Sequence, residues 1–209
     1  MVESDEEAPG IVTIDIQVAI GEEGGLAKFD LSAERRLLYT YLGRISADAG
    51  DYTAAAGFLR KKLALYPDLP PDTERRDVLS EQAVVLSQLA DCLVRGGDLR
   101  GAADAFGEAM NLEQRAGNLR GEMADCFSLG RIALRMANVT PDTRAMSQPE
   151  FHDWCAKIAD RHEALLGKST SEGGPQLVQF RASLGSNLVQ LRAITGAASA
   201  QEGEDGKNK

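Results

Sequence analysis

The feature that most constrains the fold of this chain is a spacing of large and small residues that occurs twice around a Gly-Asp turn. Each copy has a large residue followed by a small one, then the turn, then a small residue and, four positions later, a large one. The positions are Leu42, Gly43, Gly50, Asp51, Ala55 and Leu59 in the first copy, and Leu89, Ala90, Gly97, Asp98, Ala102 and Phe106 in the second. Small residues on both sides of a turn let two antiparallel helices approach closely, and the large residue fills the space between neighbouring pairs. The spacing therefore predicts stacked helical hairpins.

Turn and capping residues divide the chain into seven predicted helices. They are expected from Ser32 to about Ala49, Asp51 to about Tyr66, Asp72 to about Arg95, Asp98 to the turn before Asn118, Asn118 to about Ala137, the capping box Ser147–Glu150 to about Leu166, and Pro175 to about Thr195. Leu129-Gly130 and Leu184-Gly185 repeat the large-small pair within this scheme. The Leu anchors at 42, 89, 129 and 184 are unevenly spaced, so the later copies are expected to be incomplete.

The first 31 residues have a different character. Residues 1–10 are acidic and are expected to be disordered. Residues 11–31 are expected to form a β-hairpin, because apolar residues alternate along its first strand. The alternating residues are Val12, Ile14, Ile16, Val18 and Ile20, and they could contact another chain at the strand edge. A helical domain is expected over 32–196, and 197–209 have the composition of a disordered tail.

The spacing in residues 32–195 resembles the tetratricopeptide repeat family, whose unit is a helix–turn–helix pair. Two copies match at nearly every signature position, and Pro67 closes the first as the family pattern expects. The longer spacing is similar to repeats of about 40 residues in signalling scaffolds and bacterial multidomain regulators. The resemblance implies an α-solenoid of about three and a half hairpins. A non-repetitive helical bundle is the alternative.

In that family, the first helix of each repeat lines a concave groove that holds a partner. The resemblance places Arg44, Asp48, Gln88, Asp91, Arg95, Phe127, Arg131, Arg135, Ser186 and Gln190 in this groove. Four arginines would give it a local positive charge, and guanidinium groups suit carboxylates and phosphates. The alternative is a solvated surface in which these groups pair within the chain, such as Arg95 with Asp91 at i, i+4.

Composition narrows the class of protein. The net charge of −9 comes mainly from residues 1–23, which carry seven acids and no Lys or Arg, so a basic nucleic-acid surface is not indicated. Three widely spaced cysteines do not suggest a disulfide framework. No apolar run approaches the roughly 20 residues that a membrane span needs. We expect a cytoplasmic protein that contacts neither membrane nor nucleic acid.

Signals for catalysis or cofactor binding are weak. His152 and Cys155 share a helix face at i, i+3, but a metal site needs further ligands, and no second pair is evident. The Gly-rich stretches "GEEGG" and "SEGGP" lack the Lys and the strand-to-helix context of a phosphate loop. We therefore expect no enzyme activity, no cofactor and no metal site.

The sequence favours a protein-interaction adaptor or scaffold that binds a partner peptide or helix in the groove, with an acidic peptide as one candidate. Two alternatives stay open. The chain could be a structural subunit held through its N-terminal strand and its solenoid ends, or the sensor arm of a larger multidomain regulator. The oligomeric state and the partner are not determined by the sequence.

Overall fold

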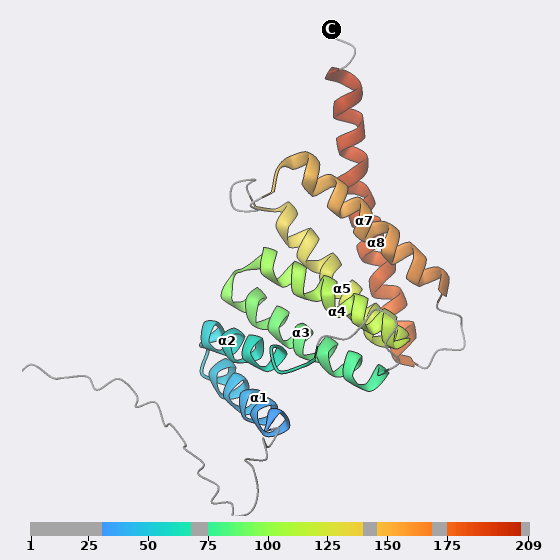
Figure 1. Ribbon diagram of the computed structural model, residues 1–209. Coiled ribbons are helices and arrows are strands. Elements are labelled where there is room, and N and C mark those ends of the chain that lie inside the picture. Colours follow the sequence, from blue (N-terminus) through green and yellow to red (C-terminus); the bar gives the residue numbers. More distant parts are fainter. Residues whose placement is uncertain (1–30, 68–74, 140–145, 169–174, 206–209) are drawn as a thin grey trace, which may run out of the picture. The chain divides into compact units, whose positions relative to one another are not determined.

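The computed structural model describes residues 31–67, 75–139, 146–168 and 175–205, with side chains described for 178–196 in the last range. These residues form seven helices and no strand (Figure 1), so the predicted mainly helical fold class is confirmed. The helices are α1 (Ser32–Asp48), α2 (Tyr52–Leu63), α3 (Arg76–Gly96), α4 (Leu99–Ala116), α5 (Leu119–Ala137), α7 (Gln148–Lys168) and α8 (Pro175–Asp205).

The chain divides into two compact units, Met1–Leu31 and Ser32–Lys209, and all seven helices belong to the second unit. The predicted acidic lead at 1–10 lies outside the described residues. The predicted β-hairpin lies outside them as well, apart from Leu31 at its end. Its strand residues Val12, Ile14, Ile16, Val18 and Ile20 therefore remain a prediction.

The two Gly-Asp turns are formed as the sequence predicts. Asp51 accepts a hydrogen bond from the backbone N–H three residues later at 2.9 Å, and Asp98 does the same at 2.8 Å. These bonds satisfy N–H groups that have no partner inside the first turn of α2 and α4. Gly50 and Gly97 precede the caps with φ of 81° and 89°, a conformation that residues with a side chain rarely adopt.

Two further predicted caps are confirmed. The side chain of Asn118 accepts from the backbone N–H of Gly121 at 3.2 Å, at the start of α5. Ser147 and Glu150 form the reciprocal capping box before α7: the Ser147 backbone N–H donates to Glu150 Oε2 at 2.9 Å, and the Glu150 backbone N–H donates to Ser147 Oγ at 3.4 Å.

Three helix ends differ from the predictions. Helix α2 stops at Leu63, three residues early, because Pro67 disfavours helical geometry in the residue before it. Helix α3 begins at Arg76, with no side-chain cap, and the predicted cap Asp72 lies outside the described residues. Helix α8 continues to Asp205. The alanines after Gly196 favour helix, so residues 197–205 of the expected disordered tail extend the helix, and 206–209 lie outside the described residues.

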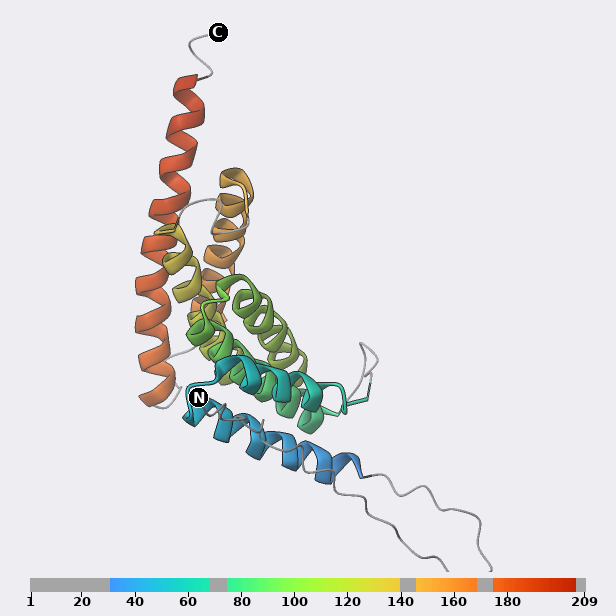
Figure 2. The ribbon, with the colours of Figure 1, turned by 90° about the vertical axis from the view of Figure 1, so that its left-hand side faces the viewer.

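Helices that follow one another in the chain pack side by side from α1 to α5, and α5 then packs against both α7 and α8 (Figures 1 and 2). Helices α7 and α8 also pack on each other. One apolar cluster runs through this arrangement and includes Leu59, Leu89, Phe106, Ile132 and Leu191. This cluster draws buried residues from α2, α3, α4, α5, α7 and α8, so the core follows the contacts between these helices.

Small residues lie where the sequence places close helix contacts. A Cβ added at Gly43 would lie 3.6 Å from Leu59 Cγ and 3.7 Å from the Ala55 carbonyl oxygen, so the space between α1 and α2 there would just admit a methyl group. Ala90 of α3 and Ala102 of α4 are fully buried at the corresponding positions. Gly43, Ala90 and Ala102 are therefore buried small residues beside the two Gly-Asp turns, as the spacing predicts.

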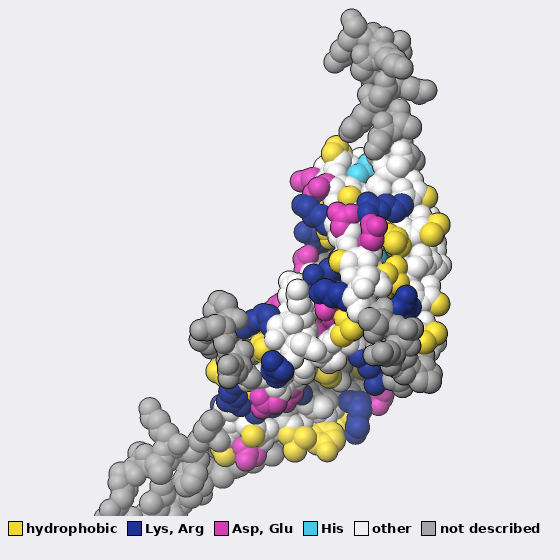
Figure 3. Space-filling model, turned by 90° about the vertical axis from the view of Figure 1, so that its right-hand side faces the viewer, with side chains coloured by type: hydrophobic (Ala, Val, Ile, Leu, Met, Phe, Trp, Pro, Cys, Tyr) yellow, Lys and Arg dark blue, Asp and Glu magenta, His cyan; other side chains and the backbone are white. Residues whose placement is uncertain are grey.

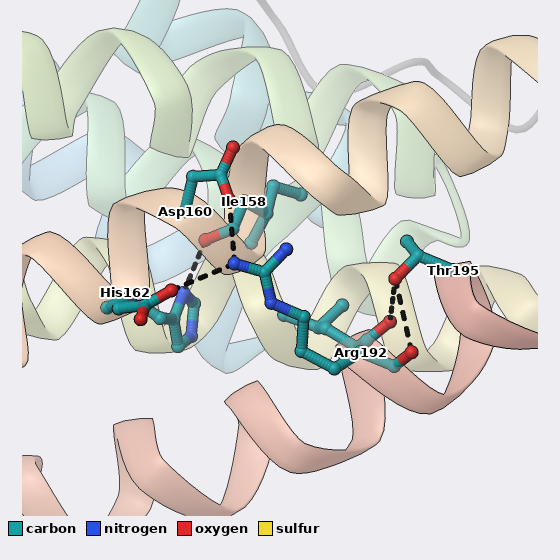
Figure 4. A network of polar contacts seen from close by, with 7 residues as sticks. Ile158, Asp160, His162, Arg192 and Thr195 are labelled. Carbon is teal, nitrogen blue, oxygen red and sulfur yellow. Dashed lines mark hydrogen bonds and ion pairs between the residues drawn. The ribbon is translucent and has the colours of Figure 1, made fainter.

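Polar contacts join α7 and α8 at the surface. The Arg192 guanidinium donates to Asp160 at 2.8 Å and to Glu163 at 2.9 Å, and Figure 4 shows Arg192 reaching from its helix towards Asp160. Both carboxylates are exposed, so these ion pairs contribute little to stability. The charge of Arg192 is therefore matched by carboxylates of the neighbouring helix.

Candidate functional site

Most of the predicted groove residues line two adjoining hollows. The first, which we call the α1–α3 hollow, has a volume of about 310 Å³ and is lined by Thr40, Gly43, Arg44, Ala47, Asp48, Tyr52, Leu59, Gln88, Asp91, Cys92 and Arg95. Five predicted residues are among them. Helix α1 supplies Arg44 and Asp48, and α3 supplies Gln88, Asp91 and Arg95.

The second hollow, which we call the α3–α5 hollow, has a volume of about 200 Å³. It is lined by Asp91, Val94, Arg95, Phe106, Ser128, Arg131, Ile132 and Arg135. Asp91 and Arg95 line both hollows, so the two adjoin along α3. We call the two hollows together the groove.

Three predicted residues, Phe127, Ser186 and Gln190, lie outside the lining of these hollows. Phe127 is next to the groove, because the Arg131 guanidinium lies 5.8 Å from the centre of its ring. Gln190 is exposed on α8 and donates to the Ser186 carbonyl oxygen at 3.4 Å. Neither Gln190 nor Ser186 lines either hollow, so α8 does not contribute the predicted groove positions here.

The charged groove residues come in pairs one helical turn apart. The pairs are Arg44 with Asp48 on α1, Asp91 with Arg95 on α3, and Arg131 with Arg135 on α5. Residues at i and i+4 share one face of a helix. The opposite face of α3 and α5 enters the core through buried residues such as Leu89 and Ile132, which turns the charged pairs outwards.

Three of the arginines lie over aromatic rings. The guanidinium of Arg95 is 5.7 Å from the centre of the Tyr52 ring, and that of Arg44 is 5.3 Å from the Tyr41 ring. Arg131 lies over Phe127 in the same way. Stacking on a ring leaves the edge of a guanidinium, with its N–H donors, available to another group.

None of the four groove arginines forms an ion pair within the described part of the chain. The intramolecular Arg95–Asp91 pair, which the sequence left open as an alternative, is therefore not formed. Partial burial raises the pKa of the Asp91 carboxyl, and the nearby Arg95 and Arg131 oppose that shift. The lining of the groove contains four arginines and two aspartates, so basic side chains outnumber acidic ones.

The residues predicted for the groove did not include the less polar part of its lining. Tyr52, Ala47, Leu59 and Cys92 surround the charged groups of the α1–α3 hollow. The sequence carried a clue to Tyr52: it directly follows the Gly50-Asp51 turn, so it lies in the first turn of α2, where the hollow between α1 and α3 opens. For Cys92, the sequence pattern indicated only a buried position.

A buried carboxyl lies behind the groove on α5. Asp125 is buried, and its Oδ1 accepts a hydrogen bond from the Ser87 hydroxyl of α3 at 2.7 Å. Burial raises the pKa of Asp125 to about 7, while the Ser87 hydrogen bond works in the opposite direction. Nearby Glu113 and Asp91 add to the rise. Near neutral pH this carboxyl therefore changes charge in the folded protein.

The raised pKa of Asp125 predicts a pH dependence of stability. The unfolded chain has an Asp pKa of about 3.9, so the folded state holds the proton more tightly between about pH 4 and pH 7. The contribution of Asp125 is most favourable below this window and is lost as the pH rises through it. We expect the stability of Asp125→Asn relative to the wild type to rise by roughly 2 to 3 kcal/mol from pH 5 to pH 8. Urea unfolding of both proteins across this range measures the difference, and a constant difference would contradict the prediction.

A second buried polar contact joins α5 and α7 away from the groove. Cys126 Sγ lies 3.2 Å from His162 Nδ1, which also lies 2.9 Å from the Ile158 carbonyl oxygen (Figure 4 shows the latter contact). Burial raises the pKa of Cys126 to about 12 and lowers that of His162. Both groups are therefore neutral near pH 7, and the thiol is not activated as a nucleophile.

The described residues contain no group of three or more His, Cys, Asp or Glu side chains placed to hold a metal ion. Of the pair considered from the sequence, Cys155 is fully buried. His152 is half-buried, and its Nε2 lies 2.7 Å from Gln148 Nε2. Across the same residues, no helix combines the length and the apolar character that crossing a membrane requires.

Comparison of the chain with protein-family models, with curated proteins and with solved structures gives no match.

Proposed function

We propose that this protein is a protein-interaction adaptor that holds an acidic peptide segment of a partner in the groove. One observation carries the proposal. Arg44, Arg95, Arg131 and Arg135 line two adjoining hollows, and none of them forms an ion pair within the described residues. An acidic peptide would supply the carboxylates that these guanidinium groups lack.

The architecture that we propose for this adaptor is a tetratricopeptide-repeat-like α-solenoid. Support comes from the packing of each helix on the next from α1 to α5, and from the small residues buried on both sides of the two Gly-Asp turns. The positions that the family resemblance assigned to a partner groove also line the two hollows, apart from Phe127, Ser186 and Gln190. A cytoplasmic location is supported by the three cysteines, which are all free and buried.

The test uses an acidic peptide library and three forms of the full chain. The first is the wild type, and the second carries Arg44→Glu, Arg131→Glu and Arg135→Glu. We expect the wild type to retain acidic peptides and this variant to lose at least about tenfold in affinity, because attraction becomes repulsion at three positions. Since all three side chains are exposed, the melting temperature should be unchanged.

The matched control carries Arg35→Glu, Arg76→Glu and Arg120→Glu. These arginines are exposed, lie outside both hollows and give the same change in net charge. Peptide retention should survive in the control apart from a general weakening at low salt. Equal loss in both variants would mean that the net charge of the protein, and not the groove, attracts the peptides.

An exposed apolar stripe on α1 favours a second candidate function, that of a structural subunit. Leu37, Leu38, Tyr41 and Ile45 are 56, 51, 47 and 62% exposed, and they lie on one side of the first helix. Figure 3 shows hydrophobic side chains gathered at the lower end of the molecule. A helix of a neighbouring subunit could cover such a stripe. In that case Leu38→Lys with Ile45→Lys would abolish a stable complex, and the arginine variant would leave it intact.

A further inference from the structure

The two hollows of the groove differ in charge. The α3–α5 hollow contains Arg95, Arg131 and Arg135 with a single acid, Asp91, so its ionised side chains sum to +2. The α1–α3 hollow contains Arg44 and Arg95 with Asp48 and Asp91, which sum to zero. A strongly anionic group is therefore attracted to the α3–α5 hollow and not equally to both.

The two hollows also differ in their apolar lining. Ala47, Tyr52, Leu59 and Cys92 line the α1–α3 hollow, where the charges balance. In the α3–α5 hollow, Phe106 and Ile132 lie behind three cationic side chains. An apolar wall excludes water and lowers the local dielectric, which strengthens the interaction between a guanidinium and an anion.

We propose that the α3–α5 hollow binds the phosphoryl group of a phosphorylated serine or threonine on a partner peptide, and that the α1–α3 hollow takes an apolar side chain of the same peptide. This inference rests on the proposed function and names the chemistry of its ligand. A phosphomonoester carries a charge of about −1.5 to −2 at pH 7, which matches the +2 of the hollow. A single aspartate or glutamate would neutralise only half of it.

The arrangement of the arginines fits such a group. Arg131 and Arg135 lie one turn apart on α5, and Arg95 comes from α3 across the same hollow. A phosphoryl group has three acceptor oxygens, and guanidinium forks from two helices can donate to them from different directions. The ring of Phe127 supports the Arg131 guanidinium and reduces its freedom before the ligand arrives.

Arginines elsewhere in the same fold show what the hollow lacks. Arg161 pairs with buried Glu122, and Arg192 pairs with Asp160 and Glu163. Within the described residues, the three arginines of the α3–α5 hollow have no such carboxylate, although Asp91 lines the same space. Their shared position therefore concentrates uncompensated positive charge, which an incoming dianion removes.

The test compares three peptide libraries on the full chain. Each library has a fixed central residue, which is phosphoserine, serine or glutamate, and degenerate flanking positions. We expect the wild type to retain the phosphoserine library about tenfold better than the glutamate library and better still than the serine library. Arg131→Gln with Arg135→Gln should remove this preference, and Arg35→Gln with Arg76→Gln, which makes the same charge change outside both hollows, should keep it.

The outcomes separate this inference from the proposed function. If glutamate and phosphoserine libraries are retained equally and both depend on Arg131 and Arg135, the phosphoryl inference is overturned and the acidic-peptide adaptor stands. If the wild type retains none of the libraries, both the phosphoryl inference and the acidic-peptide adaptor are overturned. Retention of phosphoserine peptides by the Arg131→Gln, Arg135→Gln variant overturns the assignment of the α3–α5 hollow.

The apolar side chain proposed for the α1–α3 hollow can be tested on the same retained peptides. Sequencing of the retained phosphoserine peptides should show an apolar preference at a position on one side of the phosphoserine. Ala47→Glu places a carboxylate in the α1–α3 hollow, so it should remove that preference and leave the phosphoserine dependence intact. Retained peptides with no apolar preference would overturn this half.

Discussion

Replacing Gly130 with alanine is expected to destabilise the protein by about 3 kcal/mol. An added Cβ would lie 2.7 Å from both His162 Nε2 and Asn187 Nδ2. Neither side chain can move away freely, because His162 is fully buried and Asn187 is 5% exposed. Asn187 also donates to the Phe127 carbonyl oxygen at 3.1 Å, a hydrogen bond that the methyl group would disturb.

Two other glycines provide matched controls for Gly130→Ala. The Cβ of Gly43→Ala would make only ordinary contacts at 3.6 Å or more, and that of Gly185→Ala would meet nothing within 4 Å. Both lie inside helices, where alanine is favoured over glycine by up to about 1 kcal/mol. Thermal unfolding should show a fall of roughly 10 °C for Gly130→Ala and unchanged or higher values for the controls. Similar values for all three variants would contradict the close approach at Gly130.

The second large effect is expected at the ion pair between Arg161 of α7 and Glu122 of α5. Glu122 is only 4% exposed, and the Arg161 guanidinium contacts both Glu122 and, at 2.7 Å, the Gln114 side-chain oxygen. Arg161→Met leaves the carboxylate buried, with Lys168 Nζ at 3.9 Å as its other cation. We expect a loss of about 3 kcal/mol in urea unfolding, because a buried charge without its close partner is costly.

Neutralising both partners tests that reason. In the variant with Glu122→Gln and Arg161→Met, the buried charge is gone, so more than half of the lost stability should return. Glu163→Gln is the surface control. The Glu163 carboxylate pairs with Arg192 at the exposed surface, so its loss should cost less than about 1 kcal/mol of stability. A double variant as unstable as Arg161→Met alone would show that Arg161 stabilises by packing and not by its charge.

The helices could be predicted from the sequence because their signals are local. Asp51, Asp98 and Asn118 bind N–H groups three residues away, so a residue and its partner lie in the same short stretch. Helix α2 ends before the predicted Tyr66, because Pro67 disfavours helical geometry in the residue before it. Helix α8 extends beyond the predicted Thr195, because the helix propensity of its alanines outweighs the low complexity of the stretch.

The groove could be predicted in part for the same reason. The family resemblance assigned the charged residues of α1, α3 and α5 to the groove, and because residues at i and i+4 face one way, each assigned pair lies on one side of its helix. Gln190 was placed in the groove by analogy between the last helix and the earlier ones. In the structure α8 packs against both α5 and α7, and Gln190 lines neither hollow.

By itself the sequence determined the helices, most of their caps and the side of each helix that carries charge, because these depend on hydrogen bonds and side-chain directions within three or four residues. Only the tertiary structure decided which side chains meet across helices. Cys126 meets His162, and Arg161 meets Glu122, and no sequence pattern brings either pair together. Such meetings depend on how whole helices pack, and packing depends on the shape of many side chains at once. For that reason no local spacing could assign a net charge to each of the two hollows.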